Sequence, residues 1–113
     1  MDKNYNKSEK WLEAELVKRV KAIGGKALKF SSTVETGYPD RLIIMPEGLT
    51  YWAEIKSEGE KPRKIQEVRI KYLRLMGHTV FVIDSEESLA KSCEMMARES
   101  REWRKIKIDE QTL

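Results

Sequence analysis

Residues 37–56 decide the fold, and they read GYPDRLIIMPEGLTYWAEIK. Two apolar runs, 41–45 and 49–56, flank the short polar segment 46–48. Apolar and β-branched runs on either side of a glycine-containing turn are typical of a β-hairpin. We therefore expect two adjacent antiparallel strands, the first of which is apolar enough to be buried on both faces.

Three ionisable side chains lie at the open end of this hairpin. Glu54 and Lys56 are two residues apart, so they share one face of their strand. A turn centred on Glu47 would place Asp40 directly opposite Glu54, with their Cβ atoms roughly 4.5–5.5 Å apart. Facing carboxylates repel each other, and a hard cation such as Mg²⁺ relieves this repulsion by binding both. Asp40, Glu54 and Lys56 are therefore candidate residues of a metal site.

The same residues also have a purely structural interpretation. Asp40 follows a proline, where aspartate is common in turns, and Glu54 and Lys56 could belong to a solvated strand face.

Helices and further strands are expected around the hairpin. Apolar residues recur at helical spacing from Leu12 to Ile23, and Asn6 is the expected N-cap of this helix. Residues 27–32 and 79–83 indicate short strands. Pro62 is expected in the first turn of a second helix. The buried stripe of that helix is predicted to consist of Ile65, Val68, Tyr72, Leu75 and Met76.

The predicted order of elements is αβββαβα, an α/β arrangement in which helices flank a mixed central sheet. All 113 residues fit one domain, with a core at about 8–84, a last helix at about 86–103 and a short tail. The tail is expected either to add an edge strand to the sheet or to be disordered. The strongest apolar run, 42–45, is too short to cross a membrane, and the first ten residues lack a signal-peptide core. The single cysteine excludes an internal disulfide and a cysteine-based zinc cluster. We expect an intracellular, cytoplasmic protein.

Positive charge is concentrated after the hairpin. The chain has a net charge of +3, whereas residues 56–74 carry seven basic and three acidic side chains. A basic segment beside a metal site would suit a phosphate backbone, and we expect Lys61, Arg63 and Lys64 to contact it, together with Lys29. A non-catalytic nucleic-acid-binding module would explain this charge equally well, as would an ordinary solvated helix. DNA and RNA both remain open as partners.

These motifs together resemble the VRR-NUC family of the PD-(D/E)XK nuclease superfamily. The resemblance covers about residues 8–84 and rests on Gly37 to Asp40, Glu54 to Lys56, Gln66, and the run from Leu73 to Gly77 that precedes an apolar strand. It implies a restriction-endonuclease-like core. It also implies that Asp40 and Glu54 bind the metal ion, that Ile55 adds its backbone carbonyl, and that Lys56 and Gln66 complete the catalytic site.

The family also carries an acidic residue on its first helix. Glu9 and Glu13 both qualify and share a helix face. Glu9 is our choice as the metal ligand, because it stands fifteen residues before Gly24 and this spacing fits the family pattern best.

The activity that the resemblance implies is hydrolysis of DNA phosphodiester bonds by an endonuclease that depends on Mg²⁺ or Mn²⁺. Stand-alone members of this size resemble Holliday-junction-resolving enzymes, which act on branched DNA as homodimers. We therefore expect a homodimer that prefers branched DNA. The small size suggests a compact genome, such as that of a virus or phage.

Overall fold

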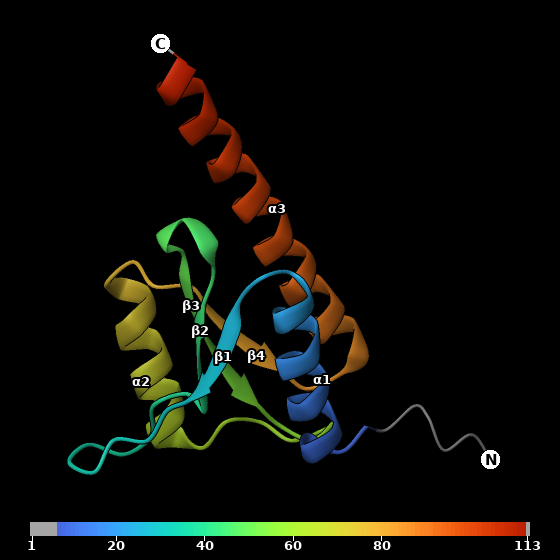
Figure 1. The fold of residues 1–113 in the computed structure, drawn as a ribbon. Helices are drawn as coiled ribbons and strands as arrows, with labels where there is room; N and C mark the ends of the chain where they lie inside the picture. The colour runs from blue at the N-terminus through green and yellow to red at the C-terminus, as the bar shows by residue number, and fades with distance from the viewer. Residues whose placement is uncertain (1–6, 113) are drawn as a thin grey trace.

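The computed structural model describes residues 7–112 and confirms the predicted order of elements (Figure 1). The first half of the chain forms α1 (Glu9–Ala22), β1 (Lys26–Lys29), β2 (Arg41–Ile44), the short 3₁₀ turn η1 (Pro46–Gly48) and β3 (Thr50–Ile55). The second half forms α2 (Lys64–Leu75), β4 (Val80–Ile83) and α3 (Glu86–Thr112). The fold is thus α/β, with η1 as the turn of the predicted hairpin.

The four strands form one mixed sheet in the order β1-β2-β3-β4. The first three strands are antiparallel neighbours, whereas β3 and β4 run parallel and are connected through α2. In the β2–β3 pair, Arg41 lies opposite Ala53 and Ile44 opposite Thr50. This register is the predicted one, and its continuation by one position places Asp40 level with Glu54.

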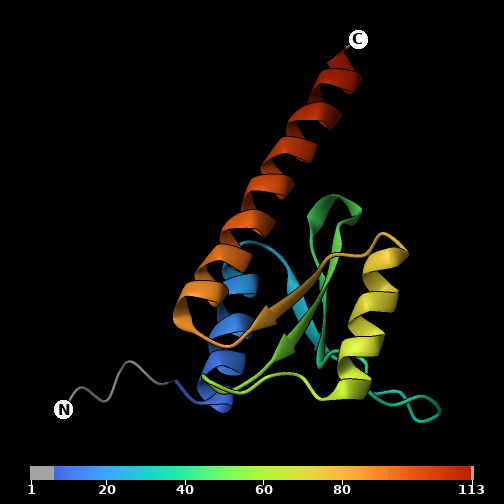
Figure 2. The ribbon, with the colours of Figure 1, turned by 180° about the vertical axis from the view of Figure 1, so that it is seen from behind.

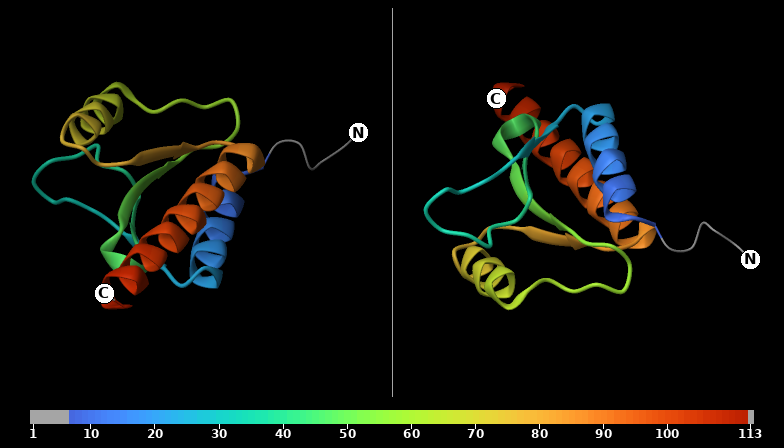
Figure 3. Two further views of the ribbon diagram at one scale, coloured as in Figure 1. Left: turned by 90° about the horizontal axis from the view of Figure 1, so that it is seen from above. Right: turned by 90° about the horizontal axis from the view of Figure 1, so that it is seen from below.

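Helices cover both faces of the sheet, as the two views in Figure 3 show. Helices α1 and α3 lie on one face, where they bury the larger apolar cluster, which includes Leu12, Leu16, Ile43, Ile55 and Met96. Helix α2 lies on the opposite face over a smaller cluster. Because side chains alternate along a strand, the even-numbered residues of β3 point toward α2. Glu54 therefore lies on the α2 face.

The burial of β2 differs from the prediction. Ile43 is fully buried, but Ile44 is 44% exposed, so the expectation that this strand is buried on both faces was wrong. The cause is the position of α2, whose smaller cluster involves β3 and β4 and leaves this end of β2 uncovered.

The N-termini of α1 and α2 also differ from the predictions. The N-cap of α1 is Ser8, whose Oγ accepts a hydrogen bond from the backbone N–H of Trp11, while Asn6 lies outside the described residues. Helix α2 begins at Lys64 rather than Pro62, because Arg63 is its N-cap and donates its backbone N–H to the side chain of Gln66.

The predicted buried stripe of α2 was wrong. Val68, Tyr72 and Leu75 are 53%, 51% and 79% exposed, and Ile65 and Met76 are exposed as well. The buried residues of the helix are instead Gln66, Ile70 and Leu73. The cause is the bond from Gln66 to Glu54, which turns this face of α2 toward the sheet and leaves the more apolar face in solvent.

Helix α3 is longer than the expected 86–103, since it continues to Thr112 and runs past the end of the sheet (Figure 2). The predicted tail is therefore helical, and the edge strand considered for Ile106 and Ile108 does not form. Two ion pairs to η1 support the beginning of the extension, since Arg104 and Lys107 lie 3.4 and 3.6 Å from the carboxylate of Glu47. Within residues 7–112, no helix has the length and apolar character needed to cross a membrane.

Candidate active site

Glu54 is the centre of the candidate site. Its side chain is completely buried on the α2 face of β3. Oε2 accepts a hydrogen bond of 2.8 Å from Nε2 of Gln66 and lies 3.2 Å from Nζ of Lys56. Oε1 is also buried, but it has no hydrogen-bond partner among the described residues. Since buried polar atoms are nearly always paired, this oxygen marks a place where a ligand is expected.

Asp40 lies beside Glu54 at the start of β2, as the register predicted. Its backbone carbonyl accepts a hydrogen bond from Phe30, which closes the loop between β1 and β2. Its carboxylate reaches across to β3, where Oδ2 accepts a hydrogen bond of 3.1 Å from the backbone N–H of Ile55. The two acids therefore occupy neighbouring positions on adjacent strands.

The electrostatics of this pair favour a cation. Burial, reinforced by the negative charge of Asp40, raises the pKa of Glu54 from 4.5 to about 6. The Lys56 ammonium group lowers this pKa but does not cancel the other two effects. A divalent cation at the free oxygen would remove the conflict between the two carboxylates.

The backbone of Ile55 faces the same place. Lys56 donates its backbone N–H to Ile83, on the β4 side of the strand. The N–H of Ile55 points the other way, to Asp40. Because the N–H and C=O of one strand residue point to the same side, the Ile55 carbonyl lies on the Asp40 side as well.

This arrangement fits a hard divalent cation. The available donors are two carboxylates and one carbonyl, all of them oxygen, and Glu54 Oε1 lacks any other partner among the described residues. Residues 7–112 contain no cluster of three or more His, Cys, Asp or Glu side chains that could hold a metal ion. A bound ion would therefore depend on Asp40, Glu54, the Ile55 carbonyl and non-protein oxygens.

Gln66 lies where its predicted role requires. Its amide Oε1 accepts a hydrogen bond of 2.7 Å from the backbone N–H of Arg63, and its Nε2 donates to Glu54. Both ends of the amide are thus occupied, which fixes its orientation. Gln66 therefore links the first turn of α2 to the buried carboxylate.

The structure does not bring the two acids of the first helix into the group. Glu9 is exposed, although its backbone N–H donates to Oγ of Ser57, three residues after Glu54. The carboxylate of Glu13 lies 3.0 Å from Nε of Arg41, with which it forms an ion pair. The proposed metal-binding role of Glu9 stays a prediction.

The four basic residues expected to contact phosphate are all exposed. Lys61, Arg63 and Lys64 lie in the loop before α2 and in its first turn, close in sequence to Gln66. Lys29 ends β1 and lies opposite Arg41, the residue after Asp40. Their contact with a phosphate backbone stays a prediction.

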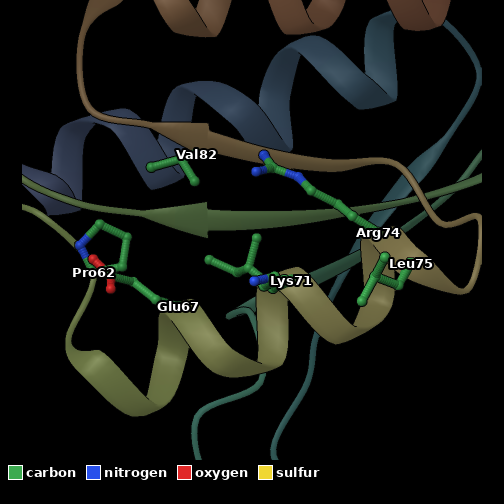
Figure 4. A pocket seen from close by; sticks show the side chains of 7 residues that line it. Pro62, Glu67, Lys71, Arg74, Leu75 and Val82 are labelled. Atoms are coloured by element: carbon green, nitrogen blue, oxygen red, sulfur yellow. The ribbon is translucent and has the colours of Figure 1, made fainter.

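A separate pocket lies elsewhere, and neither Asp40 nor Glu54 lines it. It has a volume of about 490 Å³ and opens between α2 and β4 (Figure 4). Pro62, Lys71, Arg74 and Val82 are among the residues that line it, whereas neither acid does. Its lining includes Leu75, which also belongs to the exposed apolar face of α2.

Two features near the acids were not foreseen from the sequence. Phe30 and Trp52 make an edge-to-face contact on the α2 face, with ring centroids 4.9 Å apart. Arg69 contacts the loop before Asp40, as shown by its 2.9 Å hydrogen bond to the carbonyl of Thr36. The sequence signal for Arg69 was its place in the basic segment 56–74. Its contact could not be predicted, because the loop that it binds has no regular pattern.

The mixed sheet, with its acids at the ends of β2 and β3, gives the chain a restriction-endonuclease-like fold. A solved structure described as a VRR_NUC domain superimposes with a TM-score of 0.73 and 29% identity, over 78% of this chain and 97% of that one. "Putative nuclease p44" of Acyrthosiphon pisum secondary endosymbiont phage 1 is 42% identical over 76 residues, which are 67% of this chain and 82% of that protein. No family model matches the sequence. The chain belongs to the VRR-NUC family.

Proposed function

We propose that this protein is a metal-dependent nuclease that hydrolyses phosphodiester bonds in DNA. The observation that carries the proposal is the buried Oε1 of Glu54 beside Asp40, which has no hydrogen-bond partner within residues 7–112. Pure binding of a polyanion gains nothing from two carboxylates, whereas two carboxylates are suitable ligands for a metal ion that assists hydrolysis. The similarity to a phage protein named as a nuclease supports the same conclusion.

Each residue of the site has a distinct role in this proposal. Asp40, Glu54 and the Ile55 carbonyl would hold Mg²⁺ or Mn²⁺, which when bound polarises a phosphoryl oxygen and lowers the pKa of a coordinated water. The Lys56 ammonium group would donate to a phosphate oxygen and offset the charge that develops there. Gln66 keeps the carboxylate of Glu54 in place.

A cleavage assay tests the proposal directly. Labelled four-way-junction, flap, duplex and single-stranded DNA, and one RNA duplex, are incubated with Mg²⁺, with Mn²⁺ and with a chelator. We expect cleavage that needs the metal ion and is lost in Asp40→Asn and Lys56→Ala. Glu58→Gln, an exposed change in the following loop, is the matched control and should cleave normally. Folded acid variants that cut as fast as the wild type would refute the proposal.

The substrate and assembly are part of the same proposal. We propose that selectivity comes from DNA shape and that branched DNA is preferred. Two symmetric cuts require two active sites, which a twofold homodimer supplies. Exposed apolar side chains on α2 and on the outer part of α3, such as Leu75 and Trp103, leave surface that a second copy would cover. Sedimentation as a monomer at micromolar concentration, with equal cleavage of branched and linear DNA, would refute this part.

A second candidate is a non-catalytic module that binds nucleic acid. The observation in its favour is the exposed basic group of Lys61, Arg63 and Lys64. Tight DNA binding without cleavage under any metal condition would favour this candidate over the nuclease.

A further inference from the structure

Helix α2 contacts the loop that leads to Asp40. Arg69 makes several of these contacts, since its Nε donates to the Thr36 carbonyl at 2.9 Å and its guanidinium group lies over the ring of Tyr38, 5.3 Å from the centroid. Its Nη1 also lies 3.9 Å from the carboxylate of Glu35. One side chain thus binds three of four consecutive loop residues.

The contact is close and largely covered. The Arg69 side chain is only 24% exposed. Gly37, in the middle of the bound segment, is packed so tightly that an added Cβ would lie 2.8 Å from Cγ1 of Ile65. Tyr38 also donates its hydroxyl to Glu35, which ties the loop to itself. Loop residues 35–38 are therefore bound to α2 and not merely covered by it.

This anchored segment ends two residues before Asp40. The intervening Pro39 is fully buried and has a fixed φ, so the link between Tyr38 and Asp40 is short and stiff. A displacement of the loop at Thr36 or Tyr38 would therefore move the Asp40 carboxylate by a similar distance. Gln66, three residues before Arg69 on the same helix, already holds Glu54.

We propose that Arg69 is a positioning residue that fixes Asp40 against the Ile55 backbone, so that α2 aligns both acids of the site. The inference rests on the proposed nuclease function and deepens it. Arg69 touches no reacting atom in this arrangement, because its Nε is bound to Thr36 and its Nη1 faces Glu35. Its contribution is geometric: it acts through the loop.

The test compares Arg69→Ala and Arg69→Lys with Lys71→Ala, which removes the same charge from an exposed position on the same helix. We expect Arg69→Ala to lower kcat about ten- to a hundredfold, as misplacement by about 1 Å does. The Mn²⁺ concentration for half-maximal cleavage should rise several-fold, with little change in KM for DNA. Arg69→Lys should restore little, because an ammonium group cannot reproduce the planar contact. Lys71→Ala should leave kcat and the Mn²⁺ requirement unchanged.

Two measurements on the protein without DNA complete the test. Direct titration with Mn²⁺ should show weaker binding in Arg69→Ala, and hydrogen exchange should be faster in residues 35–40. If this variant does not fold, Arg69→Lys and Tyr38→Leu serve for the same comparison. A raised KM with unchanged kcat, restored by lysine, would overturn the inference in favour of a direct DNA contact. Unaltered Mn²⁺ binding and exchange would overturn it too. Wild-type protein that cleaves nothing would instead refute the proposed function, and these two measurements would still decide the role of Arg69.

Discussion

Replacing Glu54 by glutamine should make the metal-free protein more stable at neutral pH, although it abolishes the proposed activity. The rise in the pKa of Glu54 from 4.5 to about 6 corresponds to about 2 kcal/mol of folding free energy. Because the folded state holds the proton more tightly, this stability is fully present below pH 4.5 and is lost as the pH rises through 6. Glutamine has no such titration and can still accept the hydrogen bond from Gln66.

Urea unfolding between pH 4 and pH 7.5 in the presence of a chelator measures this effect. The free energy of unfolding of Glu54→Gln, relative to the wild type, should increase by about 2 kcal/mol from the lowest to the highest pH. Glu58→Gln is the matched control and should run parallel to the wild type. Parallel curves for Glu54→Gln as well would refute the reasoning, because they would show that the buried carboxylate carries no penalty.

A bound metal ion should make the wild type more stable than Glu54→Gln. Added Mg²⁺ or Mn²⁺ at pH 7.5 stabilises the wild type by mass action, since only the folded state presents both acids. Glu54→Gln has lost one of these ligands and should gain much less. Equal stabilisation of both proteins would place the ion elsewhere.

Three further predictions concern the surroundings of the acids. Gln66→Leu leaves the Arg63 N–H without its partner and Glu54 Oε2 with Lys56 alone, so it should cost about 1–3 kcal/mol in urea unfolding and lower kcat; an unchanged kcat would contradict the role of this amide. Gly37→Ala should cost about 1–3 kcal/mol by the same assay, because φ is +92° and the new Cβ meets Ile65, whereas Gly48→Ala, at positive φ in open space, should cost less. Glu9→Gln should lower cleavage with little effect on stability, and Glu13→Gln should mainly weaken the ion pair with Arg41; the opposite result would make Glu13 the first-helix ligand.

The hairpin was predictable because two local signals agree. The turn at Glu47 and the alternation of side chains together fix the register, so the proximity of Asp40 and Glu54 follows from the order of residues alone. Gln66 was placed by its resemblance to the family pattern, since nothing in its local sequence sets it apart from a surface glutamine.

The orientation of α2 was not predictable in this way. The helix carries apolar residues on more than one face, and the face that is buried includes a polar residue bound to Glu54. Periodicity therefore selected the face with more apolar residues, Val68 and Leu75 among them, which is exposed. The length of α3 escaped prediction for a similar reason, because the ion pairs along its extension come from Glu47, in a distant part of the chain.

The hydrogen bond from Ile55 to Asp40 means that this carboxylate also continues the backbone pairing of the sheet. The β2–β3 ladder ends at the pair Arg41 and Ala53, and one step further the carboxylate of Asp40 accepts the backbone N–H that a strand partner would otherwise take. If this end of the sheet frays, Asp40 is therefore released from Ile55 and the site is lost. Asparagine at position 40 keeps an oxygen for that N–H, whereas alanine removes it. The two substitutions would thus separate the chemical role of the carboxylate from its role as a hydrogen-bond acceptor at the end of the sheet.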